Sequence, residues 1–152
     1  MQKRLNVRRL KAMIGREVGL SDWFTVTQDR IDAFAACTED RQWIHVDPEK
    51  AAASPLRGTV AHGFLILSLL PYFNFTNEIF SGRIRMAVNY GLNRVRFPNS
   101  VRPGSRIRSR AVLKGLERRG FRKVLLTVEN TVEIEGEEKP ALVADVLALV
   151  FL

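Results

Sequence analysis

The stretch AHGFLILSLLPYFNF, residues 61–75, is apolar nearly all round. A helix without a polar face has to be buried on most of its sides. Pro71 has no backbone N–H and is expected to kink the helix or to end its regular part. Ser81-Gly82 then ends the helical half of the chain. The sequence therefore predicts a central buried helix that the rest of the protein must cover.

The chain changes character from Ile84 onward, where residues alternate in the manner of strands. Alternation is clear in residues 94–97 and again from Arg106, and Pro103-Gly104 and Arg119-Gly120 offer tight turns. Three long strands joined by short turns predict an antiparallel meander over residues 106–117, 121–135 and 141–152.

An apolar helix and a sheet with one apolar face cover each other best when the sheet wraps around the helix. The sequence thus predicts an α+β fold. Because we find no internal repeat and no linker, we expect one domain over residues 1–152.

The segment before the central helix contains two further helix signals. Thr27 can cap a helix over residues 28–38, with Asp29 in its first turn. Asp47-Pro48 begins a short helix that should reach about Ala53. Residues 39–46, between the two helices, have no clear period and are expected to form a loop.

Composition predicts a cytoplasmic globular protein, at 152 residues with 46% hydrophobic and 26% charged side chains. The single cysteine, Cys37, excludes a disulfide framework within the chain. The basic N-terminus is not followed by the apolar stretch of a secretory signal. The longest apolar run, residues 60–73, is too short to cross a bilayer, which takes about 20 residues. We therefore expect no membrane association.

Charge is unevenly placed in this chain, whose formal net charge is +8. Residues 83–123 are strongly basic and contain Glu117 as their one acidic residue, whereas residues 124–152 are mostly acidic. Such asymmetry indicates either a polyanionic ligand or a set of solvated strand faces, and the sequence leaves both open.

Few residues in this sequence are candidates for catalysis or metal binding. It has two histidines, His45 and His62, and Asp40 precedes His45 by five residues. His45, His62 and Asp47 could in principle ligate a metal, but no HxH or HExxH spacing supports this. The motifs GxSxG and GxGxxG and the P-loop are also missing. A lone histidine is more often structural than catalytic, so the pair alone decides little.

The local motif around these residues is more specific. Glu39-Asp40-Arg41-Gln42-Trp43-Ile44-His45 resembles the G-D-x-N-P-[LIV]-H motif of the MaoC-like, (R)-specific enoyl-CoA hydratases, which have the hot-dog fold. Asp40, Ile44 and His45 match, whereas Gly, Asn and Pro of the motif are replaced. Residues 58–71 resemble the start of the family's central helix, and residues 89–108 resemble the strand and turn that follow. The chain is identified as a member of this family, in its NodN-like subgroup.

The resemblance implies an enzyme of fatty acid metabolism that adds water to trans-2-enoyl-CoA, giving (R)-3-hydroxyacyl-CoA, or runs the reverse dehydration. It implies that Asp40 and His45 act together as the acid–base pair and that the N–H of Gly63 stabilises the enolate oxygen. No metal or redox cofactor is implied, since CoA belongs to the substrate. We also expect a homodimer, because the meander leaves an apolar strand edge.

Other residues near the expected site are interpreted as structural and not catalytic. His62 is expected to be a hydrogen-bonding residue at the helix start, and Ser68 to bond back to a helix carbonyl. The aromatic residues Trp43 and Phe64 flank the expected site and could line an acyl pocket, although such side chains more often belong to the core.

Two other functions remain open. A hot-dog thioesterase would activate water with a carboxylate, although thioesterases of this fold lack the Asp40–His45 pairing. A non-catalytic module binding acyl-CoA or nucleic acid would suit the basic segment. However, the aromatic-interleaved basic motif of RNA-binding proteins is missing, so no nucleic-acid partner is expected.

Overall fold

The computed structural model describes residues 7–74, 79 and 84–152. The expected stop at Ser81-Gly82 lies outside this part. The helices are α1 (Val7–Ala12), α2 (Gln28–Thr38), α3 (Trp43–Val46), α4 (Pro48–Ala52), α5 (Gly63–Ser68) and α6 (Leu70–Asn74). The strands are β1 (Glu17–Leu20), β2 (Phe24–Thr25), β3 (Met86–Arg96), β4 (Arg106–Gly120), β5 (Lys123–Ile134) and β6 (Leu142–Phe151).

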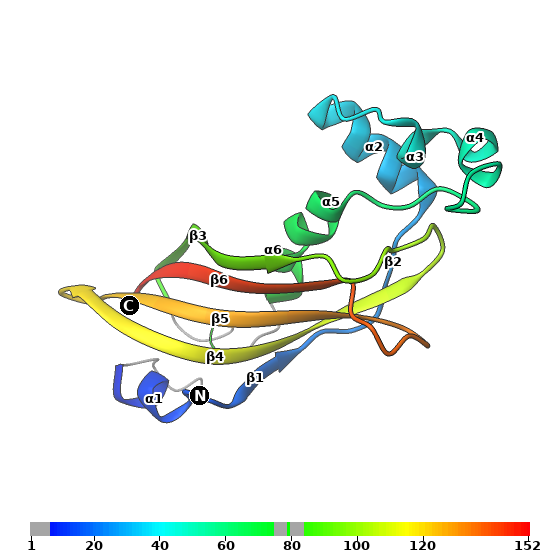
Figure 1. Cartoon of the computed structure of the whole chain (residues 1–152). Helices are drawn as coiled ribbons and strands as arrows, with labels where there is room; N and C mark the ends of the chain where they lie inside the picture. The colour runs from blue at the N-terminus through cyan, green and yellow to red at the C-terminus, as the bar shows by residue number, and fades with distance from the viewer. Residues whose placement is uncertain (1–6, 75–78, 80–83) are drawn as a thin grey trace.

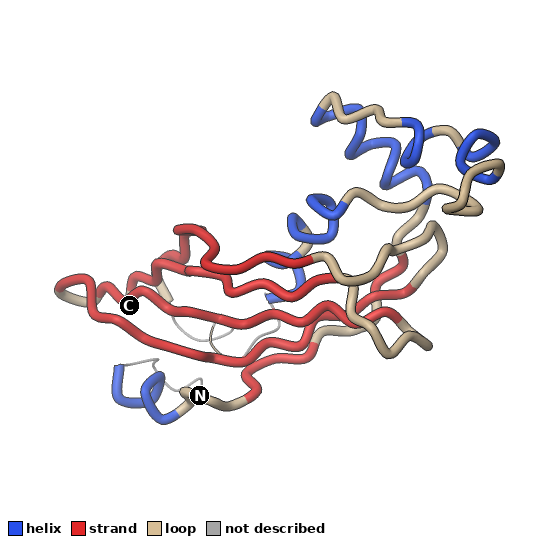
Figure 2. Tube along the Cα trace, in the orientation of Figure 1, coloured by secondary structure: helices blue, strands red, loops and turns tan. Residues whose placement is uncertain are grey.

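One antiparallel sheet carries the fold, with the strand order β1-β4-β5-β6-β3 and with β2 also paired to β4 (Figure 1). The predicted meander is confirmed as β4, β5 and β6, which pair consecutively. β3 pairs with β6 and forms one edge of the sheet, so the strand that follows the helical half lies far from β4. Figure 2 shows how the long strands make one curved layer, with the helices grouped at one end and beside it.

The central helix packs on the sheet as predicted, because Leu65, Ile66 and Leu70 join β-strand residues such as Leu142 in one buried cluster. The helix is interrupted at Leu69, two residues before Pro71, and continues as α6. The expectation that the central helix is buried on most of its sides was wrong in part. Phe64 is 68% exposed, because it lies on the side of α5 that faces a pocket next to β3.

The N-terminal half confirms two predictions. α2 spans Gln28–Thr38, and the side chain of Thr27 accepts a hydrogen bond from the Arg30 N–H at its start. Asp47 caps α4 in the same way, through the Lys50 N–H.

Other expectations for this half were wrong. Residues 43–46 form α3, a single helical turn, where a loop was expected. The short strands β1 and β2 and the helix α1 were not expected at all. Segments of two to six residues carry too little periodicity to be read, and here pairing with β4 stabilises both strands.

The uneven charge is largely accounted for by pairs across the sheet. The basic strand β4 lies beside the acidic strand β5, so that Arg108 is directly opposite Glu133. The cross-strand ion pairs include Arg110–Glu17 between β4 and β1, Arg108–Glu133 at 2.6 Å, Arg106–Glu135 at 2.8 Å, Arg94–Glu129 at 3.0 Å and Arg110–Glu133 at 3.0 Å. For these arginines the structure favours the interpretation as solvated strand faces.

Within the described residues, no helix is long and apolar enough to span a membrane.

Candidate active site

Asp40 lies just beyond the end of α2. Glu39 ends that helix in the left-handed conformation, with a φ of 63°, and this turns the chain sharply toward α3. The Asp40 side chain is 54% exposed and lines the pocket described below. Its carboxylate is therefore accessible to a ligand in that pocket.

His45 lies on α3 and is buried, with 7% of its surface exposed. Its Nδ1 donates a hydrogen bond to the carbonyl oxygen of Val60 at 2.6 Å. Because a carbonyl only accepts, this bond places the hydrogen on Nδ1 and leaves Nε2 with a free lone pair. His45 was expected on a loop, whereas the one-turn helix α3 places its ring inside the protein.

Gln28 supports this arrangement and was missed by the sequence analysis. Its Nε2 donates to the His45 carbonyl oxygen at 2.8 Å, and its Oε1 accepts from the Thr59 hydroxyl at 2.6 Å. Gln28 thus ties α2 to α3 and to the segment before α5. Its position at the first residue of a helix gave no sequence signal of this role.

The structure brings Asp40, His45 and His62 together. One carboxylate oxygen and one ring nitrogen from each histidine lie within 4.8 Å of one another. The His62 ring stacks on the His45 ring, with centroids 3.7 Å apart and planes inclined by 24°. The expected pair is therefore a cluster of three residues.

His62 lies at the helix start and forms a hydrogen bond, as expected, but this bond does not cap the helix. It occupies the N-cap position of α5, but its side chain makes no capping bond. Its Nε2 instead donates to the Asp40 carbonyl oxygen at 2.9 Å. The sequence signal that could have found this role is the placement of His62 directly before Gly63, which was read only as a helix start.

Burial is the main cause that lowers the pKa of His45 below its ordinary value of about 6.5. The nearby His62 lowers this pKa as well, whereas the bond to Val60 and the Asp40 carboxylate act in the opposite direction. His45 is therefore neutral at pH 7 and can accept a proton through Nε2.

The same three residues are the group in the described part of the chain that could hold a metal ion. Their geometry makes a poor cage, because a metal lies close to the plane of each ring that binds it, and the planes of two rings stacked at 3.7 Å and inclined by only 24° do not meet near both nitrogens. Asp47, considered as a ligand from the sequence, is outside this group because its carboxylate caps α4.

Gly63 begins α5 between His62 and the pocket-lining Phe64. A Cβ at this position would lie 3.0 Å from Cγ and Cδ1 of the Phe97 ring. The first N–H groups of a helix have no partner within it, and the hydrogen bonds of the described residues include none from Gly63. The position thus requires glycine for packing and also offers a free donor.

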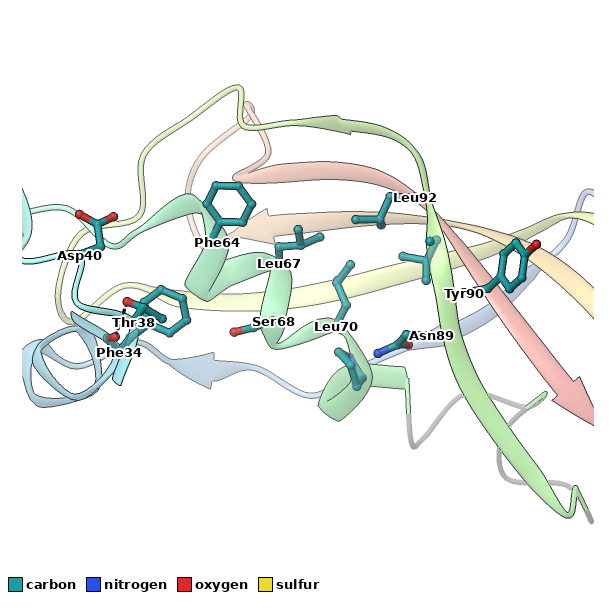
Figure 3. Close-up of a pocket in the computed structure, with 13 residues that line it drawn as sticks. Phe34, Thr38, Asp40, Phe64, Leu67, Ser68, Leu70, Asn89, Tyr90 and Leu92 are labelled. Atoms are coloured by element: carbon teal, nitrogen blue, oxygen red, sulfur yellow. Dashed lines mark hydrogen bonds between the residues drawn. The ribbon is translucent and has the colours of Figure 1, made fainter. Parts of the chain in front are cut away.

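A pocket of about 770 Å³ opens between α5, α6 and β3 (Figure 3). Asp40 lies at one end and Asn89 and Tyr90 lie at the other, with Leu67 and Leu92 between them. Phe64 lines this pocket, so its assignment to the core was wrong, whereas Trp43 does not line it and contacts Lys50. Ser68 also lines it, and its hydroxyl bonds to the Leu65 carbonyl as predicted. The arrangement can hold an apolar chain beside an acid–base pair.

Comparison with known proteins gives consistent results. Residues 9–135 match the family described as MaoC like domain. The chain is 50% identical over 140 residues to the 3-hydroxyacyl-thioester dehydratase Z of Mycobacterium tuberculosis, covering 92% of each chain. It is 48% identical over 147 residues to nodulation protein N of Rhizobium leguminosarum bv. viciae, covering 96% of this chain and 91% of that protein.

The fold is shared with a MaoC-like dehydratase from Rhodospirillum rubrum of known crystal structure. The TM-score is 0.78 at 20% identity, and the match covers 97% of both chains. The α+β hot-dog fold expected from the sequence is thereby confirmed.

Proposed function

This chain belongs to the MaoC-like dehydratase family, and from that premise we propose that it hydrates trans-2-enoyl-CoA to (R)-3-hydroxyacyl-CoA, or runs the reverse dehydration. The observation that carries the proposal is the placement of the Asp40 carboxylate within 4.8 Å of a His45 ring nitrogen. Membership of the family makes the chain an enzyme of the hydro-lyase class; the substrate and the roles of individual residues are the proposed part.

The spacing of the two groups suits one shared water molecule. Two partners that each lie about 2.8 Å from a tetrahedral water are about 4.6 Å apart. A water held between Asp40 and His45 could lose one proton as it attacks C3, while the pair delivers a proton to C2. Asp40 and His45 act as a coupled pair, so we assign the two proton transfers to the pair and not to single residues.

The tautomer and pKa of His45 support this role. The bond from Nδ1 to Val60 leaves the Nε2 lone pair available, and burial keeps the ring neutral near pH 7. A neutral imidazole of fixed orientation is the form that can accept a proton from water.

The enolate oxygen formed during the reaction needs a donor, for which we propose the Gly63 N–H. This group lies at the start of α5, next to the His62–Asp40 contact, and bonds to no described residue. Backbone donors that are already oriented stabilise such an oxyanion without reorganisation.

The pocket supports an acyl-thioester substrate. Its middle is lined by apolar side chains from α5 and β3, and its volume of about 770 Å³ is large enough for a drug-sized ligand. No metal or redox cofactor takes part in the proposed reaction, because CoA belongs to the substrate.

A second copy of the chain is the partner that we propose. All residues of β3 except Val95 are exposed, among them Met86, Val88 and Tyr90, and this strand is an edge of the sheet. An exposed apolar edge strand favours pairing with another strand, and closed twofold dimers are the commonest result. Pairing of β3 with its copy would also cover the open side of the pocket.

We place the protein in the cytoplasm, because Cys37 is exposed and unpaired, as suits a reducing compartment. Nucleic acid and membranes are not proposed as partners, since much of the basic excess pairs with carboxylates of the same sheet.

One assay separates the candidate functions. Incubation of the protein with crotonyl-CoA should lower the absorbance of the conjugated thioester to an equilibrium value without releasing free thiol. Release of thiol would favour the thioesterase, the second candidate, which shares the carboxylate beside the pocket. A protein that does neither would contradict the proposal and favour a binding module.

A further inference from the structure

His62 is the buried titratable residue that the proposed reaction does not use. Its side chain is 2% exposed and lies between two aromatic rings. Phe34 contacts it with ring centroids 5.0 Å apart, and His45 stacks on it at 3.7 Å.

The same ring also contacts Asp40. Its Nε2 donates to the Asp40 carbonyl oxygen at 2.9 Å and lies 4.0 Å from a carboxylate oxygen of the same residue. Its Nδ1 is buried and has no hydrogen-bond partner among the described residues. Only one of its two nitrogens is thus used, and it is used on the residue proposed as half of the acid–base pair.

We propose that His62 is a positioning residue, which sets the separation of the Asp40 carboxylate and the His45 imidazole by bonding to one residue and stacking on the other. The inference rests on the proposed function only for its effect on turnover. A histidine is suited to this task because phenylalanine could stack but not donate, whereas glutamine could donate but not stack.

The expected loss of rate follows from the sensitivity of a catalytic pair to displacement of its groups. Misplacement by about 1 Å can cost about 10²-fold in rate, and loss of an orienting partner typically costs about 10- to 100-fold. We therefore expect His62→Phe to lower kcat on crotonyl-CoA by about 10- to 100-fold, with KM nearly unchanged. Phenylalanine keeps an aromatic ring packed between Phe34 and His45, so the melting temperature should change little.

A second measurement does not depend on turnover. The chain has two histidines, so His62→Phe leaves His45 as its single imidazole. Two charged groups act on His45: His62, at the start of α5, lowers its pKa, and Asp40, between α2 and α3, raises it. Removal of His62 should therefore move the NMR titration midpoint of His45 to higher pH, together with the acidic limb of kcat/KM.

Ser109→Ala serves as the control variant. It removes a buried hydrogen bond between Ser109 and Asn130 within the sheet, away from the cluster. It should lose stability without loss of kcat and without a shift of the His45 midpoint. If His62→Phe does not fold, His62→Gln tests the same idea, because loss of stacking should lower kcat by itself.

The outcomes are distinguishable. A wild-type protein that does not hydrate crotonyl-CoA would refute the proposed function, while the His45 titration would still decide the positioning role. A folded His62 variant with wild-type kcat and an unmoved His45 midpoint would overturn the inference. Loss of kcat at constant KM, or a raised midpoint, would support it.

Discussion

The variant Gly63→Ala tests whether Gly63 takes part in catalysis through its N–H or is needed only for packing against Phe97. The added Cβ would lie 3.0 Å from Cγ and Cδ1 of Phe97, whereas carbon atoms normally approach to about 3.5–4.0 Å. Overpacking of this kind typically costs about 1–3 kcal/mol of folding stability. We expect the lower half of that range, because Phe97 is 42% exposed and its ring can move.

The effect on catalysis should be larger than the effect on stability. A methyl group at Gly63 would hinder the thioester from approaching the N–H, and loss of one oxyanion donor costs about 10²- to 10³-fold in kcat. We therefore expect kcat/KM of Gly63→Ala on crotonyl-CoA to fall by about 10²-fold. The protein should stay folded, since domains have about 5–15 kcal/mol of stability.

The double variant Gly63→Ala/Phe97→Leu provides the decisive comparison. Leucine in place of Phe97 removes the ring atoms that the new Cβ would meet, so the melting temperature should return to that of Phe97→Leu alone. The kcat/KM should nevertheless remain at least about tenfold below that single variant. Full recovery of kcat/KM would show that Gly63 serves packing alone and would refute the oxyanion assignment.

Three further predictions concern pH, salt and assembly. Because the pKa of His45 is lowered in the folded protein, folding stability should be constant above about pH 6.5, fall between that pH and the lowered pKa, and level off below it, whereas kcat/KM should fall as pH drops through the lowered pKa itself; wild-type urea unfolding with the same pH dependence as His45→Gln would contradict this. We expect Arg96 to help hold the CoA phosphates, because it precedes Phe97, whose ring lies against Gly63, and forms no ion pair with another described residue. The KM should then rise with salt, and Arg96→Gln should raise KM at low salt more than Arg118→Gln at the far end of β4; a KM that does not change with salt would refute this. Sedimentation should show a dimer that Val88→Lys on β3 disrupts, whereas Leu20→Lys on the opposite edge, with similar exposure, leaves it intact; a monomeric wild-type protein at micromolar concentration would exclude the dimer.

The long elements of the fold could be predicted because their signals are local. The side-chain oxygens of Thr27 and Asp47 cap helices, so these residues predict where the helices begin. In the strands of the meander, polar and apolar residues alternate over ten or more positions. β1 and β2 could not be predicted, since the residues of β4 that pair with them lie 81 to 95 positions further along the chain. Nothing local to a two-residue strand encodes such a partner.

The site was predictable only where a motif names its residues. Asp40 and His45 were found by the resemblance of one seven-residue segment, and the structure brings them together. The contribution of His62 depends on a ring stack between residues that are 17 positions apart. Gln28 acts through the His45 backbone carbonyl, which any residue type offers, and through the hydroxyl of Thr59, 31 positions away. Such contacts have no sequence pattern.

The exposure of Phe64 shows a related limit of the sequence. Its position in an apolar helix predicted burial, but the open side of that helix lines a pocket beside an edge strand. The apolar character of this face therefore reflects an expected ligand or second copy and not the core of one chain.

The most direct test of the acid–base pair is kcat/KM of Asp40→Asn on crotonyl-CoA, measured together with its melting temperature. Asparagine keeps the shape of aspartate but cannot take up the proton, and the side chain is 54% exposed, so the fold should be unaffected. We expect kcat/KM to fall by about 10²- to 10⁴-fold at an unchanged melting temperature, and His45→Gln added to Asp40→Asn should lower it little further. A folded Asp40→Asn protein that keeps more than about a tenth of the wild-type kcat/KM would contradict the account.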